Sequence, residues 1–169
     1  MFKQKESTMD ESDFKAKHVT KEYCQTIYAS PDKAFPLLCP VREAEWLDGW
    51  RYTMIYSQSG LVEEGAVFST PHDGEPDTFW VVTKHDLSNL SVEFTRFTHQ
   101  SRICVLKIGV RLRDESSSYV DIAYTYTSIS PAGNKFIDEF TDDVFRADMK
   151  HWENSVNHFL KTGEQLKRA

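Results

Sequence analysis

Glu43, Trp46 and Trp50 lie within eight residues of one another and combine one carboxyl group with two large aromatic side chains. A carboxyl group in such a setting can accept a hydrogen bond from a ligand, and it can act as a base if burial raises its pKa. A structural role is the alternative, in which Glu43 favours a helix N-terminus or pairs with charge near Arg42. The sequence leaves both interpretations open.

The six histidines show no spacing that is typical of metal ligands such as HxH or HExxH. His151 and His158 are seven residues apart and share one side of a predicted helix, where solvent-exposed side chains are favoured. Neither a GxSxG nucleophile motif nor a glycine-rich phosphate loop occurs among the seven glycines. The sequence therefore predicts no catalytic residue, no metal site and no cofactor.

His85, Arg96 and Lys107 fall on predicted central strands. A charge that points into the protein would be a strong candidate for a functional site, because an isolated buried charge is costly. The alternation of side chains leaves open which face of the sheet each one occupies.

The chain has an odd number of cysteines, and no two of them have the spacing of a CxxC motif or a zinc finger: Cys24, Cys39 and Cys104. We expect free and mostly buried thiols in a reducing cytoplasm, so the localisation predicted is cytoplasmic. A catalytic cysteine would need surroundings that stabilise the thiolate, which no motif here indicates.

The 169 residues suit one domain, and the formal net charge is −6. No run of Lys and Arg exceeds two residues, which argues against nucleic-acid binding. No apolar run approaches the ~20 residues of a membrane span, and the first residues lack the apolar segment of a signal peptide. We expect residues 1–17 to form a tail that is disordered or loosely packed, and residues 18–169 to form the domain.

The clearest periodicity runs from Asn134 to Leu160, where apolar residues recur at steps of three and four. This spacing predicts one long helix with a single apolar face, roughly 40 Å in length. The face consists of Ile137, Phe140, Val144, Phe145, Met149, Trp152, Val156, Phe159 and Leu160. Such a face requires a long hydrophobic partner.

The rest of the chain predicts that partner. A first strand is expected from His18 to Ala29, followed by two short helices that begin near Pro31 and Pro40. Six alternating segments follow with turn residues between them, which predicts an antiparallel meander: residues 51–58, 65–70, 77–84, 89–98, 101–113 and 118–130. One face of this sheet would be buried and the other wet, and the expected inward side chains include Tyr52, Met54, Tyr56, Ala66, Phe68, Leu90, Val92, Phe94, Cys104, Leu106, Ile108, Val110, Leu112, Val120, Ile122, Tyr124 and Tyr126.

Several groups of residues occur in an order that resembles a known superfamily. They are Pro40, Glu43, Trp46, Gly49 and Trp50, then Gly65, Val67 and Phe68, then Trp80 to Val82, then Thr127 to Gly133 in the segment TSISPAGN. Over residues 18–163 the chain resembles an uncharacterised bacterial branch of the START-like superfamily. This superfamily is also called the Bet v 1-like or SRPBCC group, and it includes polyketide cyclase/dehydrase and lipid-transport proteins.

The resemblance implies an α+β helix-grip fold, in which a seven-stranded antiparallel sheet curves around a long C-terminal helix, with two short helices between strands 1 and 2. It also implies a cavity between sheet and helix that opens near the short helices. The residues expected to line this cavity and bind a ligand are Glu43, Trp46, Trp50, Tyr52, Met54, Phe68, Trp80, Phe94, Tyr124, Tyr126, Phe140, Phe145, Met149 and Trp152. For any one aromatic residue, ordinary core packing is the competing interpretation.

We therefore expect non-covalent binding of a small hydrophobic or amphipathic molecule, with no nucleic-acid partner. One alternative is a cyclase or aromatase acting on a polyketide-like substrate, in which Glu43, a tyrosine or an inward Arg96 moves protons. The other is a protein-interaction module whose cavity is filled by its own side chains, with a homodimer formed through a sheet edge or the wet face.

Overall fold

The computed structural model describes residues 13–168, so the first twelve residues of the predicted tail lie outside it. Lys15 and Lys17, at the end of that tail, are tied to the domain. The backbone N–H of Lys17 donates to Ser128 Oγ at 2.7 Å, and Asn134 Nδ2 donates to the carbonyl of Lys15 at 3.0 Å. The chain is therefore anchored before the first strand begins.

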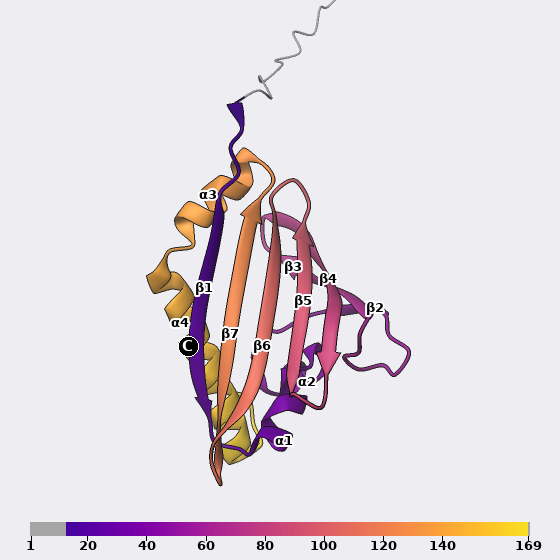
Figure 1. Cartoon of the computed structure of the whole chain (residues 1–169), viewed down its shortest axis with the longest axis vertical. Coiled ribbons are helices and arrows are strands. Elements are labelled where there is room, and N and C mark those ends of the chain that lie inside the picture. The colour runs from indigo at the N-terminus through magenta and orange to yellow at the C-terminus, as the bar shows by residue number, and fades with distance from the viewer. Residues whose placement is uncertain (1–12, 169) are drawn as a thin grey trace, which may run out of the picture.

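Seven antiparallel strands form one sheet in the order β1-β7-β6-β5-β4-β3-β2 (Figure 1). The predicted meander is confirmed, and the first strand pairs with the last one. The strands are β1 (His18–Ile27), β2 (Thr53–Tyr56), β3 (Val67–His72), β4 (Glu75–Asp86), β5 (Ser91–Thr98), β6 (Arg102–Asp114) and β7 (Ser117–Ser128).

The two predicted short helices are α1 (Pro31–Ala34) and α2 (Pro40–Trp46), each with proline in its first turn. A 3₁₀ turn, η2 (Phe35–Leu38), connects them. Gly49 follows α2 with φ of +81°, a left-handed conformation that glycine adopts at little cost.

The single helix expected from Asn134 to Leu160 is wrong, because two helices occupy that region. They are α3 (Pro131–Glu139) and α4 (Asp142–Thr162). Phe140 leaves the helical conformation at φ −81° and ψ 66°, and Thr141 caps α4 by accepting a hydrogen bond from the backbone N–H of Val144. Asp142 and Asp143 then favour the new N-terminus.

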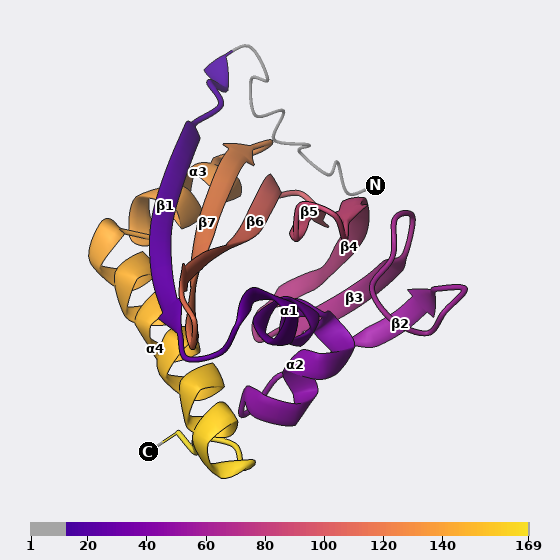
Figure 2. The same cartoon turned by 60° about the horizontal axis from the view of Figure 1, so that its bottom comes forward.

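The helix α4 lies on one face of the curved sheet, beside β1, and α1 and α2 lie at the end of the sheet that the C-terminal part of α4 reaches (Figure 2). Polar contacts fix α4 to β1. Gln25 Nε2 donates to the carbonyl of Met149 at 2.9 Å, the backbone N–H of Thr26 donates to Glu153 Oε1 at 3.3 Å, and Asn157 Nδ2 donates to the carbonyl of Thr26 at 2.8 Å. The helix is therefore held at the edge of the sheet.

Most residues expected on the inner face of the sheet are buried there, but two of them, and one residue of the expected helix face, are exposed. Tyr56 is 59% exposed, since a register shift between Met54 and Tyr56 interrupts the alternation of β2. Leu112 is 64% exposed near the end of β6, and Val144 of the expected helix face is 44% exposed in the first turn of α4. These three assignments to the buried face are wrong.

Candidate functional site

A cavity of about 500 Å³ lies between the inner face of the sheet and α4, and its wall is completed by α2. A second cavity of about 380 Å³ adjoins it toward α3. The two share five wall residues: His72, Arg96, Tyr124, Asp148 and Met149. The arrangement agrees with the cavity expected from the resemblance.

Large apolar side chains from both layers line the larger cavity. Phe68 and Trp80, on neighbouring strands, stack with ring centroids 5.3 Å apart, and Trp80 Nε1 donates to Thr70 Oγ1 at 3.0 Å. On the helix side Trp152 contacts Trp46 edge to face at 5.1 Å. These contacts hold the rings in defined orientations around the open volume.

Eleven of the fourteen residues expected to bind a ligand line one or both cavities. Glu43, Trp50, Phe68, Trp80, Phe94, Tyr124, Met149 and Trp152 line the larger one, and Tyr126, Phe140 and Phe145 line the smaller one.

Trp46, Tyr52 and Met54 are not among the lining residues of either cavity. Trp46 is fully buried, and its Nε1 donates to the carbonyl of Leu37 at 3.0 Å, so it belongs to the core between the short helices and α4. Tyr52 and Met54 are partly buried and pack against the core near β2.

Arg96 points into the protein. The sequence had left open which face of the sheet this side chain occupies. It continues the inward series Val92, Phe94 on β5, and it lines both cavities. Its Nη2 donates to Tyr126 Oη. The guanidinium carbon lies 4.8 Å from the ring centroid of Trp80, 5.1 Å from that of Tyr124 and 5.4 Å from that of Tyr126. Aromatic faces thus surround the cation.

The phenols beside Arg96 remain protonated at neutral pH. Burial raises the pKa of Tyr126 to about 12, although the charge of Arg96 opposes the shift. Burial also raises the pKa of Tyr124, which interacts electrostatically with both Arg96 and Glu43. The two hydroxyl groups are therefore neutral hydrogen-bonding groups within the site.

Glu43 lines the cavity from α2, as expected for a residue near its entrance. Burial raises the pKa of its carboxyl group to about 8. Within residues 13–168 the carboxyl group has no hydrogen-bond partner and no ion-pair partner. At neutral pH it is therefore mostly a protonated acid, able to donate a hydrogen bond or release a proton.

Polar residues that sequence reasoning did not assign to the site gather around the same cavity. His72 comes from the end of β3. Its pKa is lowered mainly by burial, and further by the positive charges of Arg96 and Arg102. Asp148 comes from the exposed side of α4. His151, expected to be solvated, is only partly exposed and lines the cavity, where Arg168 Nε lies 3.1 Å from its Nε2.

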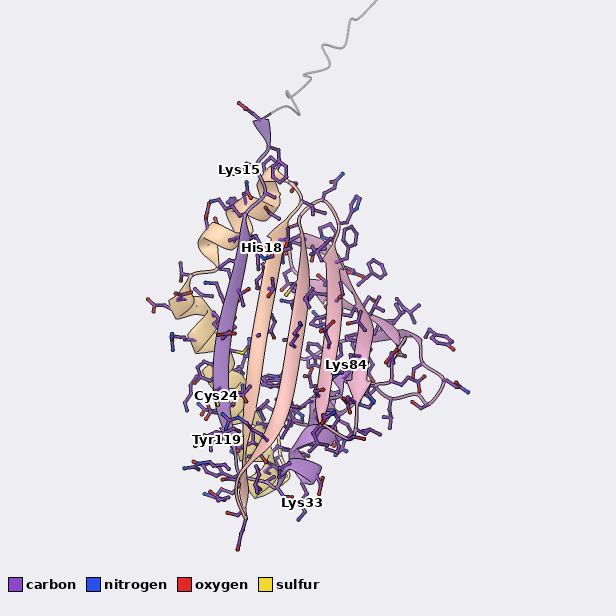
Figure 3. All side chains as sticks on the ribbon, viewed as in Figure 1. Lys15, His18, Cys24, Lys33, Lys84 and Tyr119 are labelled. Atoms are coloured by element: carbon purple, nitrogen blue, oxygen red, sulfur yellow. The ribbon has the colours of Figure 1, made fainter. Side chains whose placement is uncertain are left out.

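The other titratable residues considered from the sequence lie elsewhere. His85 stacks on Phe35 at 5.6 Å, and Lys107 is 66% exposed next to Glu93. Cys24 is exposed on the outer face of the sheet, which Figure 3 shows facing the viewer, whereas Cys39 and Cys104 are buried. Burial raises the pKa of Cys104, which keeps the thiol unreactive.

Residues 13–168 contain no group of three or more His, Cys, Asp or Glu side chains placed to hold a metal ion. No helix in this range is long and apolar enough to span a membrane.

No protein-family model matches the chain, and no curated protein matches it in sequence. Solved structures match it in fold. Norcoclaurine synthase from Thalictrum flavum has a TM-score of 0.63 at 13% identity, covering 86% of this chain and 87% of that one. The protein Ara h 8.0201 has a TM-score of 0.59 at 15% identity, covering 86% and 99%. A protein from Rhizobium leguminosarum has a TM-score of 0.61 at 10% identity, covering 87% and 97%.

These likenesses agree with the seven-stranded antiparallel sheet, the short helices after β1 and the long C-terminal helix. The chain therefore has a helix-grip fold like that of these solved structures.

Proposed function

We propose that the chain binds a small hydrophobic or amphipathic molecule, without covalent chemistry, in the cavity between the sheet and α4. The carrying observation is the cavity of about 500 Å³, whose wall combines aromatic and aliphatic side chains with charged and polar ones. Ligand sites in proteins commonly have volumes of ~300–1,000 Å³, with apolar side chains that bury the ligand and polar groups that orient it.

The fold comparison supports this proposal. Norcoclaurine synthase was solved in complex with dopamine and hydroxybenzaldehyde, so a protein of this fold binds small aromatic molecules. The open volume also argues against a cavity filled by the chain's own side chains, which was the basis of the interaction-module alternative.

The test is a titration with N-phenyl-1-naphthylamine, an uncharged dye that fluoresces in apolar surroundings. We expect saturable binding to the wild-type chain. Met149→Trp should weaken binding by on the order of tenfold or more, because Met149 lines both cavities and the larger ring would occupy them. Leu112→Trp is the matched control, since this exposed residue lies away from the cavity.

A wild-type chain that shows no saturable dye binding would overturn the proposal. Equal binding by the wild type and by folded Met149→Trp would also contradict it, because the dye would then bind elsewhere on the molecule.

A second candidate function is proton-transfer catalysis of the cyclase or aromatase type. The observation that favours it is the pairing of Glu43, with its pKa near 8, and Tyr124 in one cavity. Such a carboxyl group can both accept and donate a proton close to neutral pH. The substrate would be a polyketide-like chain with adjacent carbonyl groups, oriented by the apolar wall.

Glu43→Gln and Tyr124→Phe should each lower turnover of an accepted β-polyketone by on the order of a hundredfold, measured by chromatography with mass detection. Lys107→Gln on the outer face is the control. Unchanged turnover in both cavity variants would remove the residues on which this second function depends.

A further inference from the structure

The charge lining the larger cavity differs from that of the whole chain. The chain has a formal net charge of −6. Among the residues that line the cavity, however, arginines outnumber carboxyl groups: Arg51, Arg96 and Arg168 stand against Glu43 and Asp148. With Glu43 protonated at neutral pH, Asp148 is the remaining anion of this wall, so the cavity has a positive balance.

Arg96 and Arg102 lie on neighbouring strands and differ in their partners. Arg102 is 6% exposed and forms a two-pronged ion pair with Glu75, with both nitrogen–oxygen distances at 2.9 Å. Arg96 has no ion-pair partner among residues 13–168. A buried cation without a counter-ion is costly, and arginine does not lose its proton to avoid that cost.

The surroundings of Arg96 leave some of its donors free. One guanidinium nitrogen donates to Tyr126, the group also interacts with the Cys104 thiol, and the aromatic faces of Trp80 and Tyr124 lie beside it in the cavity. Guanidinium has five N–H donors in a fork that matches the two oxygens of a carboxylate. The free donors of this fork therefore lie where a bound molecule would be.

We propose that the ligand is an aromatic or aliphatic carboxylic acid, bound as its anion. This inference rests on the proposed function above. Its carboxylate pairs with Arg96, and its apolar body lies against Trp80, Phe94 and Met149. The bound anion supplies the counter-ion for Arg96 that residues 13–168 do not provide.

The test compares two probes of nearly equal shape, 2-naphthoate and the uncharged 2-naphthamide, by isothermal titration calorimetry at pH 7. We expect the wild-type chain to bind the acid on the order of tenfold to hundredfold more tightly than the amide, as is typical of a charge-assisted hydrogen bond. This comparison needs no variant, so a folding defect cannot confuse it.

Arg96→Met then removes the charge and keeps much of the side-chain length. We expect it to abolish the preference for the acid and to leave amide affinity within about threefold, since only the charged contact is lost. Arg111→Met is the matched control. This arginine is exposed on the outer face, where it pairs with Asp121, so the variant should keep the wild-type preference.

The outcomes separate the two proposals. Equal affinity of the wild-type chain for both probes would overturn the assignment of an anionic ligand while cavity binding itself remained. An acid preference that survives in folded Arg96→Met would overturn the role of Arg96. Failure of both probes and of the uncharged dye to bind would overturn the proposed function.

Discussion

Arg96 is the residue whose role depends most on which face of the sheet it occupies. On β5 the buried residues Val92, Phe94 and Thr98 alternate, and Arg96 falls in the same series. The sequence contained this signal, because Arg96 lies two residues beyond Phe94. Apolar patterning alone cannot extend through a charged residue, however, since a charge at an inward position contradicts the pattern that defines the face.

His72 and Asp148 show a different limit of sequence reasoning. His72 ends β3 beside a turn, and Asp148 lies on the exposed side of α4, yet the two line the same cavities. Their proximity depends on how far α4 stands from the sheet. No spacing within the chain encodes that distance, so these two residues could not be predicted.

Glu43 should make stability depend on pH. Its pKa is about 8 in the folded state against an ordinary value of 4.5, so between these values the folded chain holds a proton that the unfolded chain has released. The wild type should therefore lose stability as pH rises from about 5 to 8. Glu43→Gln lacks this penalty and should gain stability relative to the wild type over that range, on the order of a few kcal/mol.

Urea unfolding of both proteins at several pH values measures this difference. Glu45→Gln is the control, because Glu45 is exposed on the same helix. A stability difference between Glu43→Gln and the wild type that stays constant from pH 5 to 8 would contradict the raised pKa.

At the scale of elements, the break between α3 and α4 was the main error of prediction. The apolar period continues through the break, so periodicity could not reveal it. The capping sequence Thr141-Asp142-Asp143 could have revealed it, since threonine followed by acidic residues is typical of a helix start. The break turns α3 across the end of the sheet, where Phe136 packs on Tyr126 at 5.6 Å.

Gly133 makes that packing of α3 feasible. A Cβ at this position would lie 1.9 Å from the carbonyl oxygen of Ser101, which is backbone and cannot easily move. Gly133→Ala should therefore destabilise the fold by about 1–3 kcal/mol, in spite of the better helix propensity of alanine. Differential scanning calorimetry would detect this loss as a lower Tm.

Gly109→Ala is the matched control, since a Cβ there meets nothing within 4 Å. Equal melting temperatures for the two alanine variants would show that α3 can shift without cost and would contradict the prediction for Gly133.

At the scale of the whole molecule, the antiparallel meander followed from local patterns, whereas the curvature of the sheet and the open cavity did not. Alternating strands with short turns predict a meander. In the structure this meander runs from β2 to β7, and β1 pairs with β7 at the edge of the sheet. Whether a curved sheet and a helix enclose empty space depends on summed side-chain volumes across both layers. The resemblance supplied that expectation where the residue pattern could not.

Ligand binding should stabilise the whole fold, because the cavity exists only in the folded state. Dye at about a hundred times its Kd should add about 2.7 kcal/mol to the free energy of unfolding and raise Tm accordingly. Thermal melts with and without N-phenyl-1-naphthylamine test this. Met149→Trp should show little or no shift at the same dye concentration, and an equal shift would place the dye outside the cavity.

The polar contacts between α4 and β1 also affect association between molecules. β1 is a terminal strand of the sheet, and such strands can recruit a strand from another molecule through unpaired backbone groups. Here Glu153 and Asn157 already bond to the N–H and carbonyl of Thr26, and Asn157 Oδ1 also accepts from the N–H of Tyr28. The side chains that dock the helix therefore protect this end of β1 against intermolecular strand pairing and aggregation.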